Sequence, residues 1–274
     1  MERRTFLKGA GIVGGMLTAF PSSGRLWASA EDGFPLMDLH CHLSPTLTID
    51  QVMEVSKKTG VQFGIMVNPG LSLNDDAGLR RFIESLKPYP VYCGLQPMSP
   101  GWTRSYSFSP ETIKLLDYVL MDPQTVPVGN KYGETLRIWN FDTYVDDPQQ
   151  FMDTYMTHTL EVIEDQEPLH IFGWPLFLPV CIARDYYTLW TEERMQAILA
   201  ALKKRGLAVE INDLAHTPHE KFIGMAKEQG LKFTFGSDSR DSKAGRLDYC
   251  KSVAKKCGLK RDDFFVPRRV LKAV

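Results

Sequence analysis

Short apolar runs recur along the chain and alternate with stretches of helical period. Between the runs, apolar residues spaced by three and four predict helices near 76–87, 191–205 and 246–257, and residues 147–166 predict a more polar helix. The runs are short, rich in β-branched or aromatic residues and apolar on both faces, which is typical of strands in a covered parallel sheet. There are seven of them: PLMDLH, VQFGIMV, PVYCGLQ, LDYVLMD, PLHIFGW, LAVEIND and LKFTFGSD.

Capping residues mark two further helix starts. Thr48 with Gln51 predicts a capping box, in which each side chain accepts a hydrogen bond from the other residue's main chain. Thr217 with Glu220 predicts a second box, with Pro218 in the first helical position. The pattern as a whole predicts seven β/α units joined by right-handed crossovers.

Strands that alternate with helices can form an open doubly wound sheet or a closed barrel. The polar clusters of this chain follow the C-terminal ends of the predicted strands. Such ends converge at one mouth in a barrel, whereas an open sheet would string them along an edge. We therefore predict an α/β fold over residues 31–274, a distorted (β/α)7 TIM-like barrel.

Two long connections, 99–112 and 123–146, are rich in aromatic residues and are expected at the barrel mouth, facing the substrate. Their aromatic side chains are candidates for a platform that stacks on a ring or sugar, with loop packing as the alternative: Trp102, Tyr106, Tyr132, Trp139 and Phe141.

The first thirty residues are predicted to lie apart from the barrel. Arg3 and Arg4 precede a glycine-rich, weakly apolar run, and Ala28 to Ala30 fit an A-x-A cleavage site. This arrangement resembles a twin-arginine (Tat) signal, which implies export by the Tat machinery to the periplasm or another extracytoplasmic space. A cytoplasmic protein with a basic amphipathic start is the alternative. The run is too short and too broken by glycine for a membrane anchor.

Charge and cysteine content narrow the function classes. Without residues 1–30, which hold four basic residues and one acidic residue, 28 basic and 32 acidic residues remain, a net charge of −4. A mildly acidic chain argues against a nucleic-acid groove built on general positive charge. The five cysteines are odd in number and form no C-x-x-C, so no disulfide framework is indicated.

The first strand carries an Asp-x-His-x-His pattern. In an extended segment alternate residues point the same way, so His40 and His42 can present their imidazoles to one ion, with Asp38 on the same side. The last strand ends in Gly-Ser-Asp, which adds Asp238. Imidazole and carboxylate ligands together suit zinc, manganese or iron.

The motifs MDLHCHLS and EQGLKFTFGSDSR resemble the first and last motifs of the polymerase-and-histidinol-phosphatase (PHP) family, and LAVEIND, DYVLMD and LHIFGWPLFLP resemble those between them. The resemblance implies a distorted seven-stranded barrel and a hydrolase, largely of the phosphoesterase type, with up to three metal ions at the mouth. The wider amidohydrolase superfamily shares the opening H-x-H and the closing aspartate.

The chain departs from the family at several ligand positions. Amide oxygens are poor substitutes for carboxylates around a divalent ion, and tryptophan cannot ligate one. The resemblance therefore predicts a reduced site with one divalent ion on His40, His42 and Asp238, and with Asp122 as a further candidate ligand. The residues that stand where the family supplies ligands are Val67, Asn68, Gln96, Gln124, Trp174 and Arg240.

The leading hypothesis is an exported, PHP-like, metal-dependent hydrolase of the phosphoesterase type that acts on a small anionic molecule. Asp238 and Glu210 are the candidate catalytic residues. The alternative is a degenerate barrel that binds a ligand without turnover. Candidates for substrate binding are Arg240, Asn212, Gln96 and Asn68.

The remaining histidines are predicted to be structural. His170 falls in the middle of a predicted strand and is expected in the core, with its hydrogen bonds satisfied. His158, His216 and His219 are expected at the surface.

Overall fold

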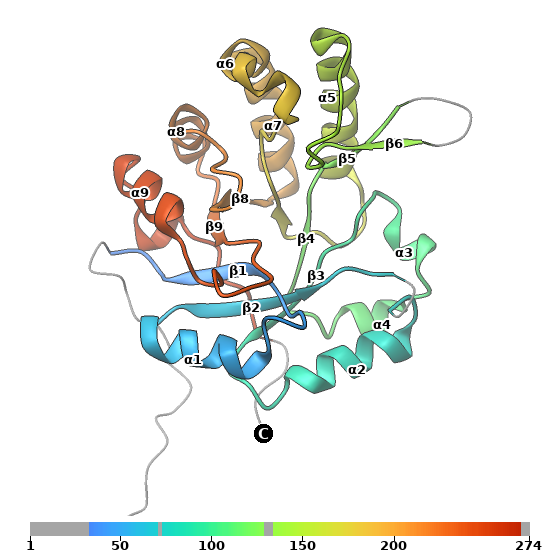
Figure 1. The fold of residues 1–274 in the computed structure, drawn as a ribbon, viewed down its shortest axis with the longest axis vertical. Coiled ribbons are helices and arrows are strands. Elements are labelled where there is room, and N and C mark those ends of the chain that lie inside the picture. The colour runs from blue at the N-terminus through green and yellow to red at the C-terminus, as the bar shows by residue number, and fades with distance from the viewer. Residues whose placement is uncertain (1–32, 71–72, 129–133, 270–274) are drawn as a thin grey trace, which may run out of the picture.

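A seven-stranded parallel sheet curls into a nearly closed barrel with helices around its outside (Figure 1). The structure, a computed structural model, describes residues 33–70, 73–128 and 134–269, so the predicted export signal lies outside the described residues. The strands follow the order β1-β2-β3-β4-β7-β8-β9. They are β1 Met37–His42, β2 Gln62–Val67, β3 Tyr92–Leu95, β4 Tyr118–Met121, β7 Ile171–Phe172, β8 Ala208–Asn212 and β9 Phe233–Gly236.

The two edge strands meet at the C-terminal end of the barrel. Cys41 and Ser239 form a parallel bridge, in which the main-chain N–H of His42 donates to the Ser239 carbonyl over 3.0 Å. This bridge draws β1 against the segment that follows β9. All seven predicted strands are present, and the predicted barrel is confirmed.

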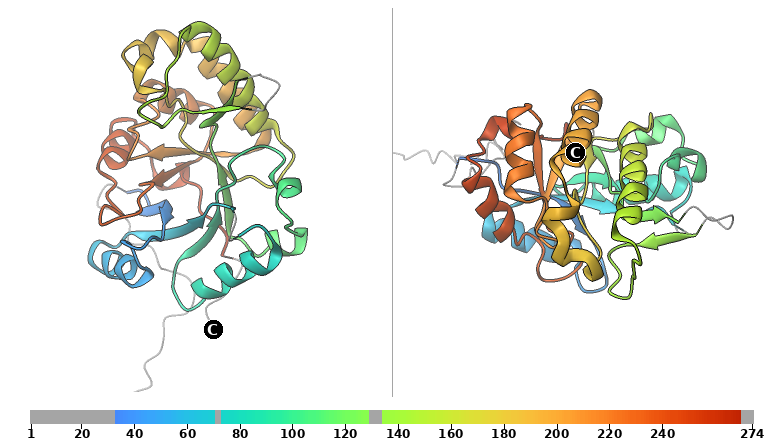
Figure 2. Two further views of the ribbon diagram at one scale, coloured as in Figure 1. Left: turned by 45° about the vertical axis from the view of Figure 1, so that its right-hand side comes forward. Right: turned by 90° about the horizontal axis from the view of Figure 1, so that it is seen from above.

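Each barrel strand is followed by at least one helix, as the predicted β/α units require, and the helices lie outside the sheet (Figure 2). An antiparallel hairpin, β5 Thr125–Pro127 and β6 Thr135–Arg137, interrupts the connection after β4. The helices are α1 Ile49–Thr59, α2 Asp76–Leu86, α3 Trp102–Ser105, α4 Pro110–Ile113, α5 Pro148–Glu164, α6 Tyr186–Leu189, α7 Glu192–Arg205, α8 Glu220–Glu228 and α9 Asp248–Lys256, with short 3₁₀ segments at Val180–Asp185 and Arg261–Asp263.

One predicted capping box is confirmed and the other is wrong. At the start of α1 the Thr48 side chain accepts from the main-chain N–H of Gln51, whose own side chain accepts from the Thr48 N–H. Before α8, Thr217 is instead bridged to Asn212 at the end of β8, so it belongs to a turn. The helix begins two residues later than predicted, after His219, whose side chain makes no cap.

The barrel interior is filled by side chains, as in other TIM-like barrels. The Tyr118 ring crosses it, and its hydroxyl donates to the Leu39 carbonyl over 2.8 Å. A Cβ atom on Gly64 or Gly94 would lie 2.3 Å or 2.5 Å from an atom of this tyrosine, so both glycines make room for the ring. The interior cluster consists of Met37, Leu39, Met66, Tyr92, Tyr118, Leu120, Ile171 and Ala208.

Two histidine predictions are wrong. His158 is buried, because α5 packs a broad apolar face that includes Phe151 and Met152 against the barrel, although its sequence looks polar. His170 is not in the core but exposed just before β7, where its Nδ1 accepts from the main-chain N–H of Val119. His216 is exposed, as predicted.

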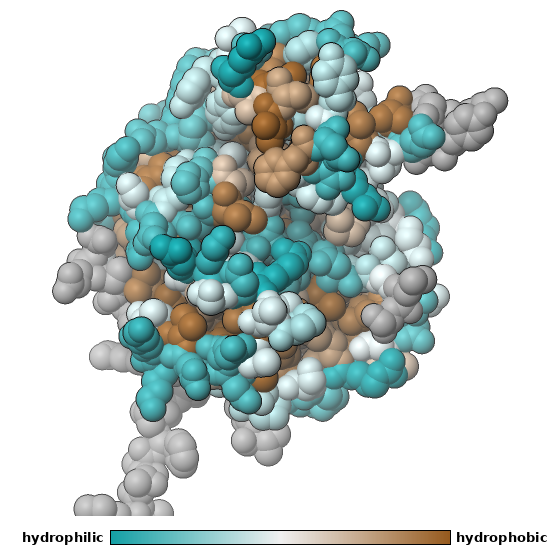
Figure 3. Space-filling view, in the orientation of Figure 1, coloured by the Kyte–Doolittle hydropathy of each residue, from teal (hydrophilic) through white to brown (hydrophobic). Residues whose placement is uncertain are grey.

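The aromatic side chains of the two long connections, 99–112 and 123–146, do not all face the barrel mouth. Trp102 is fully buried and lies against Phe108, with ring centroids 6.3 Å apart, so it cannot stack on a substrate. Tyr132 lies outside the described residues. Phe141 and Tyr187 are the most exposed of the large apolar residues described. Hydrophilic side chains cover much of the face seen in Figure 3. Within the described ranges, no helix has the length and apolar content that crossing a bilayer needs.

Candidate metal centre

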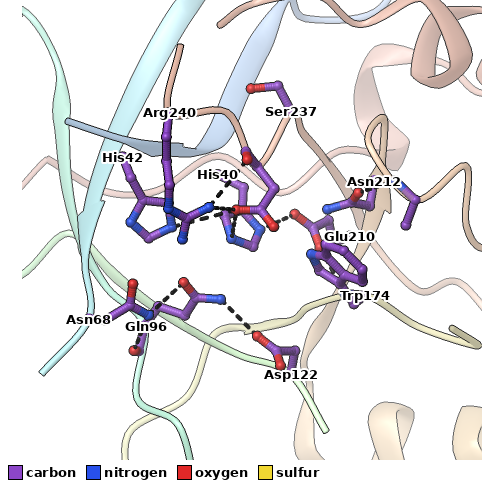
Figure 4. Close-up of polar contacts among 12 residues, drawn as sticks. His40, His42, Asn68, Gln96, Asp122, Trp174, Glu210, Asn212, Ser237 and Arg240 are labelled. Carbon is purple, nitrogen blue, oxygen red and sulfur yellow. Dashed lines mark hydrogen bonds and ion pairs between the residues drawn. The ribbon is translucent and has the colours of Figure 1, made fainter. Parts of the chain in front are cut away.

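His40, His42 and Asp238 come together at the C-terminal mouth of the barrel, where both imidazoles approach one carboxylate (Figure 4). The His40 Nε2 atom lies 3.2 Å and the His42 Nε2 atom 3.8 Å from Asp238 Oδ1. One ligand atom from each residue falls within 4.8 Å of the others. Among the described residues, no other group of three histidine, cysteine or acidic side chains has this geometry.

A β-bulge in β1 aims both histidines into the mouth. The pairing register with β2 shifts between Asp38 and Cys41, where β1 holds one extra residue. Before the bulge Met37 and Leu39 face the barrel interior, and after it Cys41 packs on the outside. A bulge shifts the alternation of side chains by one residue. His40 and His42 therefore follow Leu39 on the inner side.

The same bulge removes Asp38 from the metal-binding group, contrary to the expectation from simple alternation. Its carboxylate accepts hydrogen bonds from the Ser237 N–H and hydroxyl, from the Gly245 N–H and from the His40 N–H, over 2.6 to 3.2 Å. Burial raises the pKa of this carboxyl to about 6, against the effect of those bonds. Asp38 ties β1 to the segment after β9, and so holds two of the candidate ligands in register.

Glu210, at an inward position of β8, orients His40. Its Oε1 lies 2.6 Å from His40 Nδ1, and its Oε2 accepts from the main-chain N–H of Trp174 over 2.8 Å. Two acceptor oxygens fixed in this way favour the tautomer that carries its proton on Nδ1 and leaves Nε2 as a ligand. Burial opposes protonation of His40, but Asp238 and Glu210 on its two sides hold its pKa well above the ordinary value.

Gly236 makes room for this pair. A Cβ atom at this position would lie 2.0 Å from Glu210 Oε1 and 2.6 Å from His40 Cβ. The sequence pattern gives Gly236 no role, although it is the glycine of the Gly-Ser-Asp motif. For Trp174 the pattern indicates only that a family ligand is missing. Its main chain, at a φ of 44°, nevertheless supplies the second hydrogen-bond donor to Glu210.

The three side chains fit a divalent ion. His40 Nε2 and His42 Nε2 are both buried without a hydrogen-bond partner, and such buried polar atoms are rare unless they bind something. Burial, together with the charges of His40 and Arg240, lowers the pKa of His42 to about 3, so this imidazole is neutral. Burial works against ionisation of Asp238, but His40 and Arg240 hold its pKa well below the ordinary value. Two imidazoles and a carboxylate are a common ligand set for zinc and iron.

Arg240, a predicted substrate-binding residue, lies directly over this group (Figure 4). Its Nη1 donates to Asp238 Oδ1 over 2.7 Å. The side chain is 49% exposed, so the guanidinium faces the open mouth. An arginine here can meet an anionic group of a ligand that enters from solvent.

Asn68, Gln96 and Asp122 form a hydrogen-bonded chain across the ends of β2, β3 and β4. Asn68 Nδ2 donates to Gln96 Oε1 over 2.8 Å, and Gln96 Nε2 donates to Asp122 Oδ2 over 2.7 Å. Asp122 therefore lies outside the group of three, although it was a candidate ligand. Burial raises the pKa of Asp122 to about 6.

Asn212 completes the predicted set at the end of β8. Its Oδ1 accepts from the main-chain N–H of Ala215 over 2.9 Å and so shapes the loop that follows the strand. Its Nδ2 is buried without a partner. The structure thus brings all nine predicted site residues to one mouth, three as a group and six around it.

No family model matches this chain, and no curated protein matches it. Among solved structures, a chain of the "cryo-EM structure of archaeal Ribonuclease P with mature tRNA" is 9% identical, with a TM-score of 0.38, over 81% of this chain and 89% of that one. Amidohydrolase 2 from Bifidobacterium longum subsp. infantis is 15% identical, with a TM-score of 0.41, over 84% and 94%. A β-mannanase from Streptomyces thermolilacinus is 13% identical, with a TM-score of 0.35, over 84% and 80%. With all three TM-scores below 0.5, the functional assignment rests on the site itself.

Proposed function

We propose that this chain is a metal-dependent hydrolase that holds one divalent ion, zinc, manganese or iron, on His40, His42 and Asp238. The observation that carries the proposal is the pair of buried Nε2 atoms that lack hydrogen-bond partners and face one carboxylate. A bound ion would supply Lewis-acid chemistry, which activates water and polarises the bond to be cleaved. The stoichiometry of one follows from the single group of this kind among the described residues.

The protein's own residues prepare this chemistry. Glu210 acts through His40 and is therefore a positioning residue, although its sequence position suggested a catalytic one. Asp238 stays ionised at neutral pH, because its neighbours hold its pKa low. Asp122 is suited to move a proton, because its pKa of about 6 lies close to the working pH of most enzymes.

The finer proposal is a phosphoesterase-type reaction on a small anionic substrate. Arg240 supports it, because a guanidinium binds phosphate and other oxyanions through paired hydrogen bonds. Asn212 Nδ2, a buried donor without a partner, is a second candidate contact for substrate oxygens. Gln96 and Asn68 hold each other and Asp122, and so set the shape of the opposite wall.

The test is metal reconstitution followed by turnover. Protein stripped with a chelator is loaded with zinc, manganese or iron(II), dialysed and analysed for metal, and then assayed on phosphomonoesters, phosphodiesters and simple amides. We expect one equivalent of metal, and activity that depends on it. His42→Gln should lose the metal, whereas His219→Gln, a half-buried histidine bonded to Tyr186, should keep it. Less than a tenth of an equivalent in the wild type would overturn the proposal.

A second candidate is a non-catalytic ligand-binding protein. The amide groups of Asn68 and Gln96 favour it, because they stand where a polynuclear site would need anionic ligands. In this case the reconstituted protein binds metal and small oxyanions, but shows no turnover on any of the three substrate types.

We further propose that the chain is exported through the Tat pathway to the periplasm. The proposal is supported by the order of twin arginine, glycine-rich run and A-x-A site within residues 1–30. Export of a folded protein would allow the metal to be loaded before transport.

A further inference from the structure

Arg240 and the metal-binding group share a single carboxylate oxygen. Asp238 Oδ1 lies 2.7 Å from Arg240 Nη1, and the same atom lies 3.2 Å from His40 Nε2 and 3.8 Å from His42 Nε2. Figure 4 shows the Arg240 guanidinium beside the imidazoles of His40 and His42. A cation of the chain itself therefore stands beside the place where a metal ion would bind.

Hydrogen bonds hold the main chain of Arg240, whereas a single residue, Asp238, holds its guanidinium among the described residues. The carbonyl of Arg240 accepts hydrogen bonds from the hydroxyls of Ser44 and Thr46 over 2.6 Å and 3.1 Å. Within the part of the chain that the structure describes, the guanidinium bonds only to Asp238, through its carboxylate and, at 3.4 Å, its carbonyl. The Arg240 side chain is 49% exposed, whereas that of Asp238 is only 10% exposed, so the guanidinium is the end of this pair that solvent and a ligand can reach.

Electrostatic repulsion would oppose a metal ion beside the guanidinium. Asp238 Oδ1 is the oxygen that Arg240 already contacts and that an ion between His40 and His42 would also approach. A divalent ion on this carboxylate would place two cations a few ångströms apart. Their repulsion weakens metal binding unless an anion enters and draws the guanidinium away.

We propose that Arg240 and the metal ion compete for Asp238, and that an oxyanion of the sulfate or phosphate type relieves this competition by binding the guanidinium in the mouth. The inference rests on the proposed metal site. It makes metal and oxyanion binding cooperative, and the coupling is reciprocal. A substrate that carries such an oxyanion would then tighten the metal that acts on it.

The test measures zinc affinity in two salts. Metal-free protein competes with a chromophoric chelator for zinc in sodium sulfate, and then in sodium chloride of equal ionic strength. Sulfate is the probe because it leaves zinc soluble. We expect sulfate to tighten zinc binding by the wild type about tenfold, within the usual range of such couplings.

Arg240→Gln should bind zinc about three- to tenfold more tightly than the wild type in chloride, and sulfate should no longer change its affinity. Arg184→Gln is the control, because Arg184 is 89% exposed and paired with Asp185; it should keep the wild-type response to sulfate. Equal zinc affinities of the wild type in the two salts, or weaker zinc binding by Arg240→Gln, would overturn the inference but leave the metal site standing. No zinc binding by the wild type in either salt would overturn both.

Discussion

Replacing Glu210 by glutamine changes how the barrel prepares His40 for a metal ion. In the wild type both carboxylate oxygens are acceptors, one for His40 Nδ1 and one for the main-chain N–H of Trp174. Glutamine offers one acceptor and one donor. The Trp174 N–H can only donate, so it takes the amide oxygen, and the new NH₂ group faces His40. That donor favours the tautomer with its proton on Nε2, the atom that the metal needs.

The expected loss of metal affinity follows from this contact. Removing the carboxylate partner of a metal-binding histidine typically costs 10- to 100-fold in affinity, which corresponds to about 1.4 to 2.8 kcal/mol. We expect Glu210→Gln to fall in this range, because the 2.6 Å contact is fully buried and one donor replaces one acceptor. Competition with a chromophoric chelator gives the affinity, and NMR of ¹⁵N-labelled histidine reports the tautomer of His40.

A matched control separates ligand orientation from general destabilisation. Asp117 is a buried carboxylate at the opposite end of the barrel, where it accepts from the main-chain N–H of Cys93 over 2.8 Å. Asp117→Asn should therefore lower stability without changing metal affinity. Glu210 would have no such role if Glu210→Gln bound metal within about twofold of the wild type, or if His40 kept its proton on Nδ1 in that variant.

Three further predictions concern proton balance, packing and export. Because burial raises the pKa of Asp122 to about 6 from 3.8, its ionisation above pH 6 destabilises the folded chain. Asp122→Asn should therefore raise the free energy of unfolding, measured in urea at about pH 7.5, by up to about 3 kcal/mol. The gain should disappear near pH 4, and the turnover of the variant should drop. An equal gain in stability at both pH values would contradict this prediction. Gly236→Ala should lose metal binding and about 1–3 kcal/mol of stability, measured by thermal or urea unfolding. The control Gly224→Ala, with no atom within 4 Å of the added Cβ, should leave stability unchanged or raise it. A Gly236→Ala protein that still bound metal would contradict the tight packing. Changing Arg3 and Arg4 to lysine should retain the precursor in the cytoplasm, as cell fractionation would show, and unchanged export would rule out the Tat pathway.

The sequence alone predicted the seven barrel strands and most of the helices between them. A strand that is apolar on both faces can be buried only between a helix layer and a second apolar surface. The runs LAVEIND and LKFTFGSD could therefore be identified as barrel strands from the sequence alone. The sequence also predicted the candidate ligands His40, His42 and Asp238, for a related reason. Polar residues that end apolar strands lie at the barrel mouth, and alternate histidines share one side.

The errors came from local patterns that packing overrides. The Thr217 capping box failed because Thr217 bonds to Asn212 in a turn, a contact that competes with the helix cap. His158 was expected at the surface, but α5 buries a wider face than its hydrophobic spacing suggests. Trp102 was expected in a long connection at the barrel mouth, but it begins the short helix α3 and its ring is fully buried.

Only the tertiary structure decided which polar side chains of the mouth act together. The bulge in β1 comes from its register against β2, and it turns Asp38 away from the two histidines that follow it in the pattern. The contact between His40 and Glu210 joins residues 170 positions apart, and Gly236 on a third strand makes room for it. A period of two residues fixes the alternation of side chains within one strand. It cannot fix the phase of that alternation at a bulge or the partner across the barrel, because both depend on how neighbouring strands pair.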